Sequence, residues 1–169
     1  SSARREFNVA TLNFNDGSSL LLSDQVIGMV NTFNGDNGDD TFTSYNASAG
    51  ESINVFNGYG GDDTFIGGGN NIFNGGTGND TIQTTVGSDV LIFNQGDGND
   101  NVIGYNTRSV EFQFGEGITV DNLSIDLVSR QLSYGNQGDT IVSNLFSSSI
   151  ITFTFFDNTS ITHEGLLQG

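Results

Sequence analysis

The sequence predicts an all-β protein, a parallel solenoid flanked by antiparallel β-hairpin caps. Three observations predict it: a ten-residue phrase opening with Phe-Asn occurs four times, apolar residues recur at two fixed places in it, and hairpin patterns lie near both ends. A short repeat that cannot bury its apolar face alone becomes stable by stacking on its neighbours. We expect residues 1–29 to be a hairpin cap or the tail of a preceding module, residues 30–104 to form the solenoid, and residues 105–169 to form a C-terminal cap.

The four phrases set the length of one turn of the solenoid, here called a coil. They read FNGDNGDDTF, FNGYGGDDTF, FNGGTGNDTI and FNQGDGNDNV, and they start at steps of 23, 17 and 20 residues. Two half-turns of about nine residues make one coil, so each phrase advances the chain by about one coil. We expect two internal ladders, one of Phe33, Phe56, Phe73 and Phe93 and one of Phe42, Phe65, Ile82 and Val102.

Each phrase places an aspartate at the same point, which gives the column Asp40, Asp63, Asp80 and Asp100. Ca²⁺ takes six to eight oxygen ligands at roughly 2.3–2.6 Å, more than one turn supplies. Two stacked turns supply two carboxylates and the carbonyl groups that glycine exposes. Four turns enclose three gaps, so we expect about three calcium ions. The alternative is that these residues only form turns.

The opposite half-turns fit the pattern less well. The segment 84–91 keeps a glycine and Asp89. The segment 47–54 aligns with it but has Ser52 at the position of Asp89. The segment 67–72 is shorter and has no carboxylate. We therefore expect calcium mainly on the first side, with one further ion possible at Asp89.

The phrases resemble the nonapeptide Gly-Gly-x-Gly-x-Asp-x-apolar-x of the RTX (repeats-in-toxin) calcium-binding family, most closely at residues 75–83. The segment 112–127 is similar to the capping segment of haemolysin-type calcium-binding proteins. The resemblance implies a right-handed parallel β-roll, calcium between successive turns, and export from Gram-negative bacteria by a type I system. The family includes toxins, proteases, lipases, epimerases and adhesins, so the resemblance does not select an activity. Asp36, Tyr59 and Gln95 replace glycines of the family pattern.

The resemblance and the repeat together assign metal-site positions. They are Gly35, Asn37, Gly38, Asp40, Gly58, Gly60, Gly61, Asp63, Gly75, Thr77, Gly78, Asp80, Gln95, Asp97, Gly98 and Asp100, with Asp89 on the opposite side.

Composition supports a role for cations. The chain has 20 acidic residues, four arginines and no lysine, and its formal net charge is −16. Such a chain should repel itself and stay disordered without counter-ions, so that calcium binding supplies folding free energy. The absence of cysteine excludes disulfides and fits a metal-stabilised secreted or cell-surface module. Its acidity makes nucleic acid a poor partner, and no apolar run reaches the roughly 20 residues of a membrane span.

The two ends of the chain resemble each other in sequence. Residues 11–21 align without gaps with residues 152–162, each as a hairpin whose turn lies at Asp16-Gly17 or Asp157-Asn158. Residues 131–146 predict another hairpin, which turns at 135–138. Caps of this kind cover the open ends of a solenoid. We expect a monomeric module of a longer chain, in contact with neighbouring modules.

Three classes of function remain open. The first is a calcium-folded structural module of a large secreted protein. The second is a calcium-dependent binder of a sugar, ice or a cell-surface ligand, and the third a polysaccharide-processing β-helix. We favour the first and expect no enzyme activity, because paired carboxylates recur in every coil whereas an active site needs one place that differs. The single histidine, His163, is expected on a surface strand.

Overall fold

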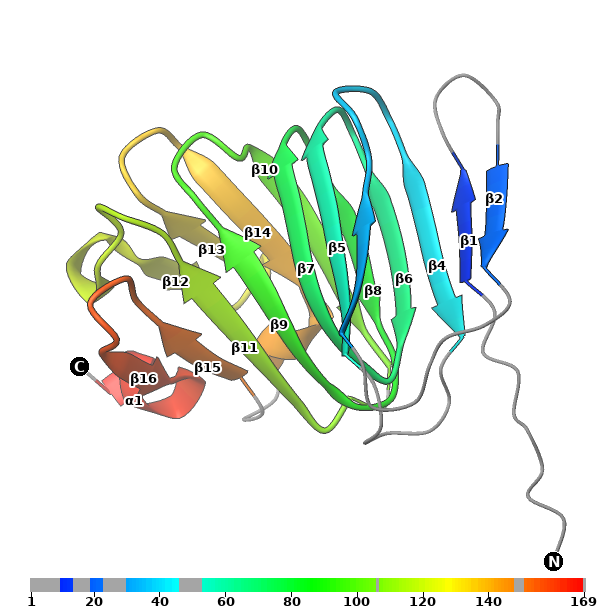
Figure 1. Ribbon diagram of the computed structural model, residues 1–169. Helices are drawn as coiled ribbons and strands as arrows, with labels where there is room; N and C mark the ends of the chain where they lie inside the picture. Colours follow the sequence, from blue (N-terminus) through cyan, green and yellow to red (C-terminus); the bar gives the residue numbers. More distant parts are fainter. Residues whose placement is uncertain are drawn as a thin grey trace, which may run out of the picture.

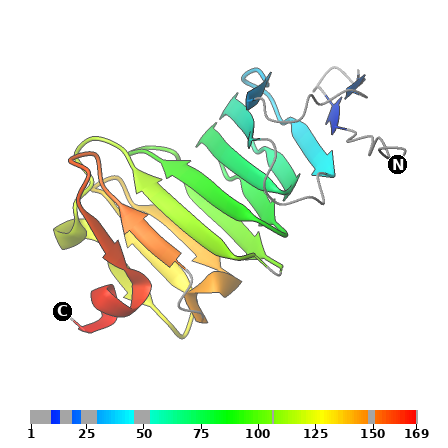
Figure 2. The same cartoon turned by 60° about the horizontal axis from the view of Figure 1, so that its bottom comes forward.

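The chain forms a β-solenoid of about four turns in the computed structural model, which describes residues 10–13, 19–22, 30–45, 53–105, 107–147 and 151–168. Figure 1 shows two sheets wound face to face, with β1–β2 at one end and α1 at the other. Figure 2 shows the same order of elements from a second direction. The prediction of an all-β parallel solenoid with hairpin caps is confirmed.

Each coil gives one strand to each sheet. The seven-stranded sheet has the order β16 (Ser160–Thr162), β15 (Ile151–Thr154), β11 (Ser109–Phe114), β9 (Ser88–Phe93), β7 (Asn70–Thr77), β5 (Ile53–Gly60) and β3 (Val30–Asn34). The nine-stranded sheet has the order β12 (Ser124–Asp126), β13 (Gln131–Tyr134), β14 (Asp139–Ser143), β10 (Asn99–Gly104), β8 (Thr81–Thr84), β6 (Thr64–Gly68), β4 (Thr41–Tyr45), β1 (Ala10–Asn13) and β2 (Ser19–Leu22). Two short 3₁₀ helices, Val120–Asn122 and Asn144–Ser147, and α1 (His163–Gln168) complete the described elements.

The core is a pair of aromatic ladders between the sheets. Phe33 stacks on Phe56 at 5.0 Å between ring centroids, and Phe56 stacks on Phe73 at 5.5 Å. On the facing sheet Phe42 stacks on Phe65 at 5.0 Å, and their edges meet the first ladder at 5.8 Å and 5.9 Å. All five rings are at most 5% exposed. Burial of each such side chain stabilises the fold by about 1.5–3 kcal/mol.

One predicted ladder position is wrong. Phe73 pairs with Leu91 and not with Phe93, which instead pairs with Phe114. The facing ladder continues as expected, since Ile82 pairs with Val102. The turn of the fourth coil is therefore two residues longer than that of the third, and the repeated Phe-Asn motif lies two residues further along its coil.

The caps extend the sheets of the solenoid. β11 pairs in parallel with β9, β14 with β10 and β15 with β11, so parallel stacking continues beyond residue 104. The three predicted hairpins are present as the antiparallel pairs β1–β2, β13–β14 and β15–β16. The predicted turn at Asp16-Gly17 lies outside the described residues. No helix in the described part of the chain is long and apolar enough to cross a membrane.

Candidate metal centre

The four repeated aspartates lie inside the solenoid, at the edge where the chain passes from the seven-stranded to the nine-stranded sheet. We call Asp40, Asp63, Asp80 and Asp100 the acidic edge; they are 2%, 1%, 2% and 4% exposed. Each backbone N–H of the first three donates to Oδ1 of the aspartate in the next coil, at 2.7, 2.8 and 2.9 Å. The carboxylates therefore form a continuous column through the stacked turns.

The residue before each aspartate links the same coils in the opposite direction. Asp62 donates its backbone N–H to Asp39 Oδ1 at 2.8 Å, and Asn79 donates its own to Asp62 Oδ1 at 2.8 Å. Asn99 repeats the contact to Asn79 at 3.2 Å. These outer side chains are exposed. Each Asp-Asp or Asn-Asp pair thus joins the coil before it and the coil after it.

In two of the four inner carboxylates, those of Asp40 and Asp63, one oxygen has no hydrogen-bond partner among the described residues. Asp40 Oδ2 accepts from the Asp36 N–H at 2.8 Å, whereas Asp63 Oδ2 and Asp40 Oδ1 are buried and have no partner among the described residues. A buried charge without a partner costs several kcal/mol. Burial, and after it the neighbouring carboxylates Asp80 and Asp40, raises the pKa of Asp63 to about 7. The acidic edge therefore needs protons or cations.

Burial also raises the pKa of the other column members. The pKa of Asp80 is raised to about 6 and that of Asp100 to about 8, with nearby carboxylates adding to both shifts. The four arginines of the chain are at positions 4, 5, 108 and 130, and none of them contributes to these shifts in the described structure.

Glycines make room for the carboxylates. A Cβ on Gly35, Gly58 or Gly75 would overlap Oδ2 of the aspartate five residues later. A second glycine column has a different role. Gly61, Gly78 and Gly98 have positive φ angles of 99°, 141° and 110°, and carbonyl groups of the preceding coil lie against them. At another position of the turn, Tyr59 pairs with Gly76, which has φ 94°, and adopts a φ of 75° without being a glycine.

The predicted positions are only partly brought together. Asn37 and Thr77 have exposed side chains. Gln95 points to the second cap, where its Nε2 donates to the Glu116 carbonyl at 3.5 Å. Within the described ranges no group of three or more His, Cys, Asp or Glu side chains is arranged so that it could hold a metal ion. A cation at the acidic edge would therefore have no more than two of these carboxylates as ligands, and its other ligands would have to be backbone carbonyls or water.

The opposite edge of the coil is built from amides. We call Asn31, Asn54, Asn71 and Asp89 the amide edge, since pairing of the strands places them in one column. Asn31 donates to Asn54 at 3.3 Å, Asn54 to Asn71 at 3.1 Å, and Asn71 to Asp89 Oδ1 at 2.9 Å. The predicted alignment of Ser52 with Asp89 is wrong, because Asn54 and Asn71 occupy that column.

Asp89 ends the amide edge. Its Oδ1 also accepts the Asn71 backbone N–H at 3.0 Å, while its Oδ2 is buried without a partner among the described residues. Burial raises the pKa of Asp89 to about 7 against the lowering effect of Asn71. The next side chain in the column is that of Val110, so no second carboxylate adjoins Asp89.

Several residues of interest were not predicted as parts of a site. Asn54 and Asn71 have a signal in the sequence, since each stands two residues before the phenylalanine that opens a phrase. Asp139 and Tyr134 have no repeated context that marks them. His163 is only 5% exposed and begins α1, so the expectation of a surface strand is wrong.

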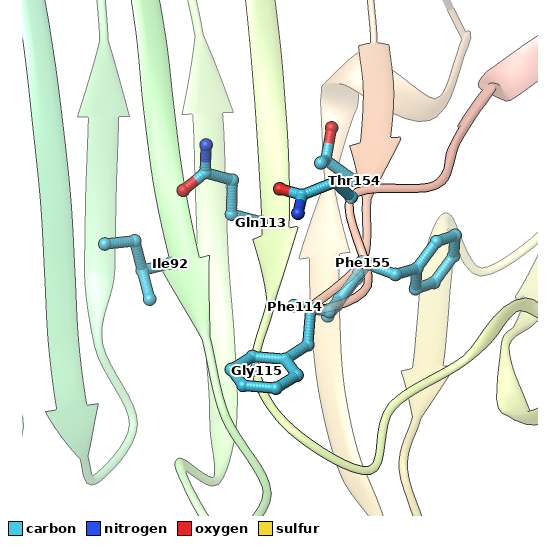
Figure 3. A pocket seen from close by; sticks show the side chains of 8 residues that line it. Ile92, Gln113, Phe114, Gly115, Thr154 and Phe155 are labelled. Carbon is cyan, nitrogen blue, oxygen red and sulfur yellow. The ribbon is translucent and has the colours of Figure 1, made fainter.

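A hollow of about 270 Å³ lies on the outer face of the seven-stranded sheet. Its walls include Ile92, Gln113 and Thr154, which pair across β9, β11 and β15 (Figure 3). Phe156, which is 67% exposed, and Asn158 also line the hollow.

No family model and no curated protein matches this chain.

Proposed function

We propose that this chain is a calcium-binding structural module of the RTX type, in which calcium ions bridge the carboxylates of the acidic edge. It belongs to a large secreted bacterial protein, is disordered in the low calcium of the cell, and folds when millimolar calcium fills about three sites outside. The proposal assigns no catalytic step to the module.

One observation carries this proposal: aspartate stands where asparagine would satisfy the same hydrogen bond. Asn54 joins Asn71 at the amide edge through neutral side chains, and in the outer row the amide oxygen of Asn79 accepts the backbone N–H of Asn99 in the next coil. At the acidic edge Asp63 Oδ1 accepts a backbone N–H, and an amide oxygen could accept it as well. The second oxygen of Asp63 has no donor in the described structure. A hard divalent cation is the partner for which a buried carboxylate is better than an amide.

Magnitudes agree with a folding switch. At a free calcium concentration one hundred times Kd, each site adds about 2.7 kcal/mol. Three sites then add about 8 kcal/mol, which is comparable with the roughly 5–15 kcal/mol stability of an ordinary domain.

Circular dichroism during a calcium titration at pH 8 tests the proposal. We expect a change from disorder to β-structure that a chelator reverses, with about three ions bound by calorimetry. Magnesium should be much weaker because it demands a small octahedral shell and keeps its water. A chain that has the same strand content with and without calcium, and binds none, would refute the proposal.

The hollow on the outer face favours a second candidate, a calcium-dependent ligand-binding module. Gln113, Thr154 and Asn158 offer hydrogen-bonding groups there, and the exposed ring of Phe156 offers an apolar surface, as sugars require. A glycan array probed with the calcium-loaded protein tests it. Binding that is lost in Gln113→Ala supports this candidate, and an array without any bound glycan opposes it.

A further inference from the structure

The outer face of the seven-stranded sheet carries side chains in two straight rows that run from coil to coil. Strand pairing gives each row one residue per strand, about 4.8 Å from the next. The polar row consists of Asn34, Asn57, Asn74, Ile92, Gln113 and Thr154. The aliphatic row lies beside it, two residues earlier on each strand, and consists of Thr32, Val55, Ile72, Val90, Glu111 and Thr152. Both rows therefore repeat with the period of the solenoid.

Contacts within the face hold several of these side chains in place. Asn57 Nδ2 donates to Asn34 Oδ1 at 2.7 Å along the polar row. Gln113 Nε2 donates to Glu111 Oε1 at 3.0 Å and so links the two rows. The valines, the isoleucines and the threonines are branched at Cβ, which restricts χ1. Such a face loses little conformational entropy when a ligand settles on it.

The face is nearly neutral in a strongly acidic molecule. Of the six residues in each row only Glu111 is ionisable, whereas the whole chain has a formal net charge of −16. An anionic polymer would be repelled by the rest of the chain, and a cationic one would meet more carboxylates elsewhere on it. The two rows therefore suit an uncharged ligand.

The face is hollowed where β9, β11 and β15 pair. The hollow of about 270 Å³ lies over the polar row, and three members of that row line it side by side on neighbouring strands (Figure 3). A second hollow, of about 350 Å³, lies over the aliphatic row at Val90, Glu111 and Thr152. The two adjoin at Thr154, which lines both. A concave surface with a few fixed polar groups is typical of ligand sites.

We propose that a linear, uncharged polysaccharide lies along the two rows, parallel to the axis of the solenoid, with about one sugar for each coil. A sugar presents C–H groups on its ring faces and hydroxyl groups at its rim. The aliphatic row contacts the C–H groups, and the carboxamides of the polar row both donate to and accept from the hydroxyl groups. This inference rests on the second candidate function, the ligand-binding module, and gives the class, direction and length of its ligand.

Calorimetry on the calcium-loaded full chain tests the inference, with linear neutral glycans (cellulose, chitin, xylan and mannan oligomers of two to six sugars) as probes and oligogalacturonate as the acidic control. One neutral glycan should bind at least about tenfold more tightly as a hexamer than as a dimer, because the longer chain spans more coils. Oligogalacturonate should not bind. An affinity that does not depend on oligomer length would overturn the inference.

Variants away from the hollows separate the rows from the hollows themselves. Ile72→Lys should weaken binding of the hexamer by about tenfold. Asn74→Ala should weaken it as well and remains informative if Ile72→Lys fails to fold, because Asn74 Oδ1 has no hydrogen-bond partner among the described residues. Val142→Lys is the control, since this valine is 42% exposed on the nine-stranded sheet.

Wild-type affinity in both row variants, with binding lost only in Gln113→Ala, would overturn the inference and leave the second candidate function intact. A chain that folds with calcium and binds no glycan would overturn both, and the calcium-folded structural module would stand.

Discussion

The acidic edge and the amide edge join the same coils by the same kind of contact, a side-chain oxygen that accepts from the neighbouring coil. They differ in charge. At the amide edge the neutral amides of Asn31, Asn54 and Asn71 link one coil to the next, and only the last member, Asp89, is a carboxylate. At the acidic edge every coil adds a buried carboxylate. The comparison teaches that hydrogen bonding alone accounts for the shape of the coil, whereas charge neutralisation decides whether it is stable.

The largest expected effect is on the pH dependence of the calcium-free chain. The folded pKa values of Asp63, Asp89 and Asp100, about 7, 7 and 8, lie above the ordinary aspartate value of 3.8, so the folded state holds more protons than the unfolded state between pH 4 and 8. The free energy of unfolding should therefore rise by on the order of 5–10 kcal/mol from pH 8 to pH 5. Circular dichroism of the calcium-free chain across this pH range measures the effect, because a chain that is disordered at pH 8 should gain strand signal as the carboxylates are protonated.

Calcium should reverse that trend, because protons and calcium compete for the same oxygens at the acidic edge. In saturating calcium the chain should lose stability as the pH falls. A calcium-free chain that also loses stability on acidification would show that the buried carboxylates are not the groups that limit folding.

Asp63→Asn places a neutral amide in the acidic edge and so makes this position resemble the amide edge. Asp63 borders two of the gaps between coils, so in saturating calcium the variant should lose about 5 kcal/mol, twice the contribution of one site. Without calcium, at pH 8, it should be at least as stable as the wild type, since the amide keeps the contact to the Asp40 N–H and removes a buried charge. Chemical unfolding gives the value in calcium, and the strand signal in circular dichroism compares the two calcium-free chains.

Asp62→Asn is the matched control, because the outer side chain is exposed and its Oδ1 contact to Asn79 can be kept by an amide. It should change stability by less than about 0.5 kcal/mol in either condition. Equal losses in both variants would remove the distinction between inner and outer residues.

Asp89→Asn would complete the amide edge with a neutral side chain. We expect it to stabilise the chain by about 2–4 kcal/mol at pH 8, since the pKa of Asp89 is raised to about 7 and each unit is worth about 1.4 kcal/mol. The gain should not depend on calcium: thermal unfolding measures it in calcium, and a higher strand signal in circular dichroism shows it in the calcium-free chain. A loss of one bound calcium in this variant would instead make Asp89 a ligand, as the sequence allows.

Gly58→Ala should destabilise the chain by about 2–3 kcal/mol and weaken calcium binding, because the new Cβ overlaps Asp63 Oδ2 and the Gly75 carbonyl. Gly138→Ala is the control, since φ is 87° there but nothing lies within 4 Å of a Cβ. It should cost only about 1 kcal/mol of backbone strain. Calcium affinity by calorimetry distinguishes the two glycines.

The smallest expected effect is that of Tyr59→Gly. The tyrosine has φ 75° and an exposed side chain, so relief of strain should stabilise the chain by about 0.5–1 kcal/mol. Thermal unfolding in calcium measures the gain. A destabilised variant would mean that the tyrosine ring itself contributes to the turn.

The sequence predicts the acidic edge well, because Gly and Asp recur at fixed offsets and only a stacked turn satisfies both. It also predicts the ladders through the third coil and the three hairpins. It fails at Phe93, since the repeated Phe-Asn motif hides a two-residue insertion that only strand pairing reveals. The amide edge escapes detection because asparagine in a glycine-rich chain is also a turn former. Asp139 has no repeated partner, so its place beside the fourth turn depends on how the cap folds back.

The reciprocal contacts of the Asp-Asp and Asn-Asp pairs have a consequence for how such a protein changes in length. A middle coil presents the same donors and acceptors above and below, so a copy can be duplicated or deleted without altering what its neighbours meet. The fourth coil is different, because its enlarged turn is matched to Asp139 of the cap. Middle coils can therefore be gained or lost during evolution without a change elsewhere. The fourth coil cannot, because it and the second cap have to be kept together.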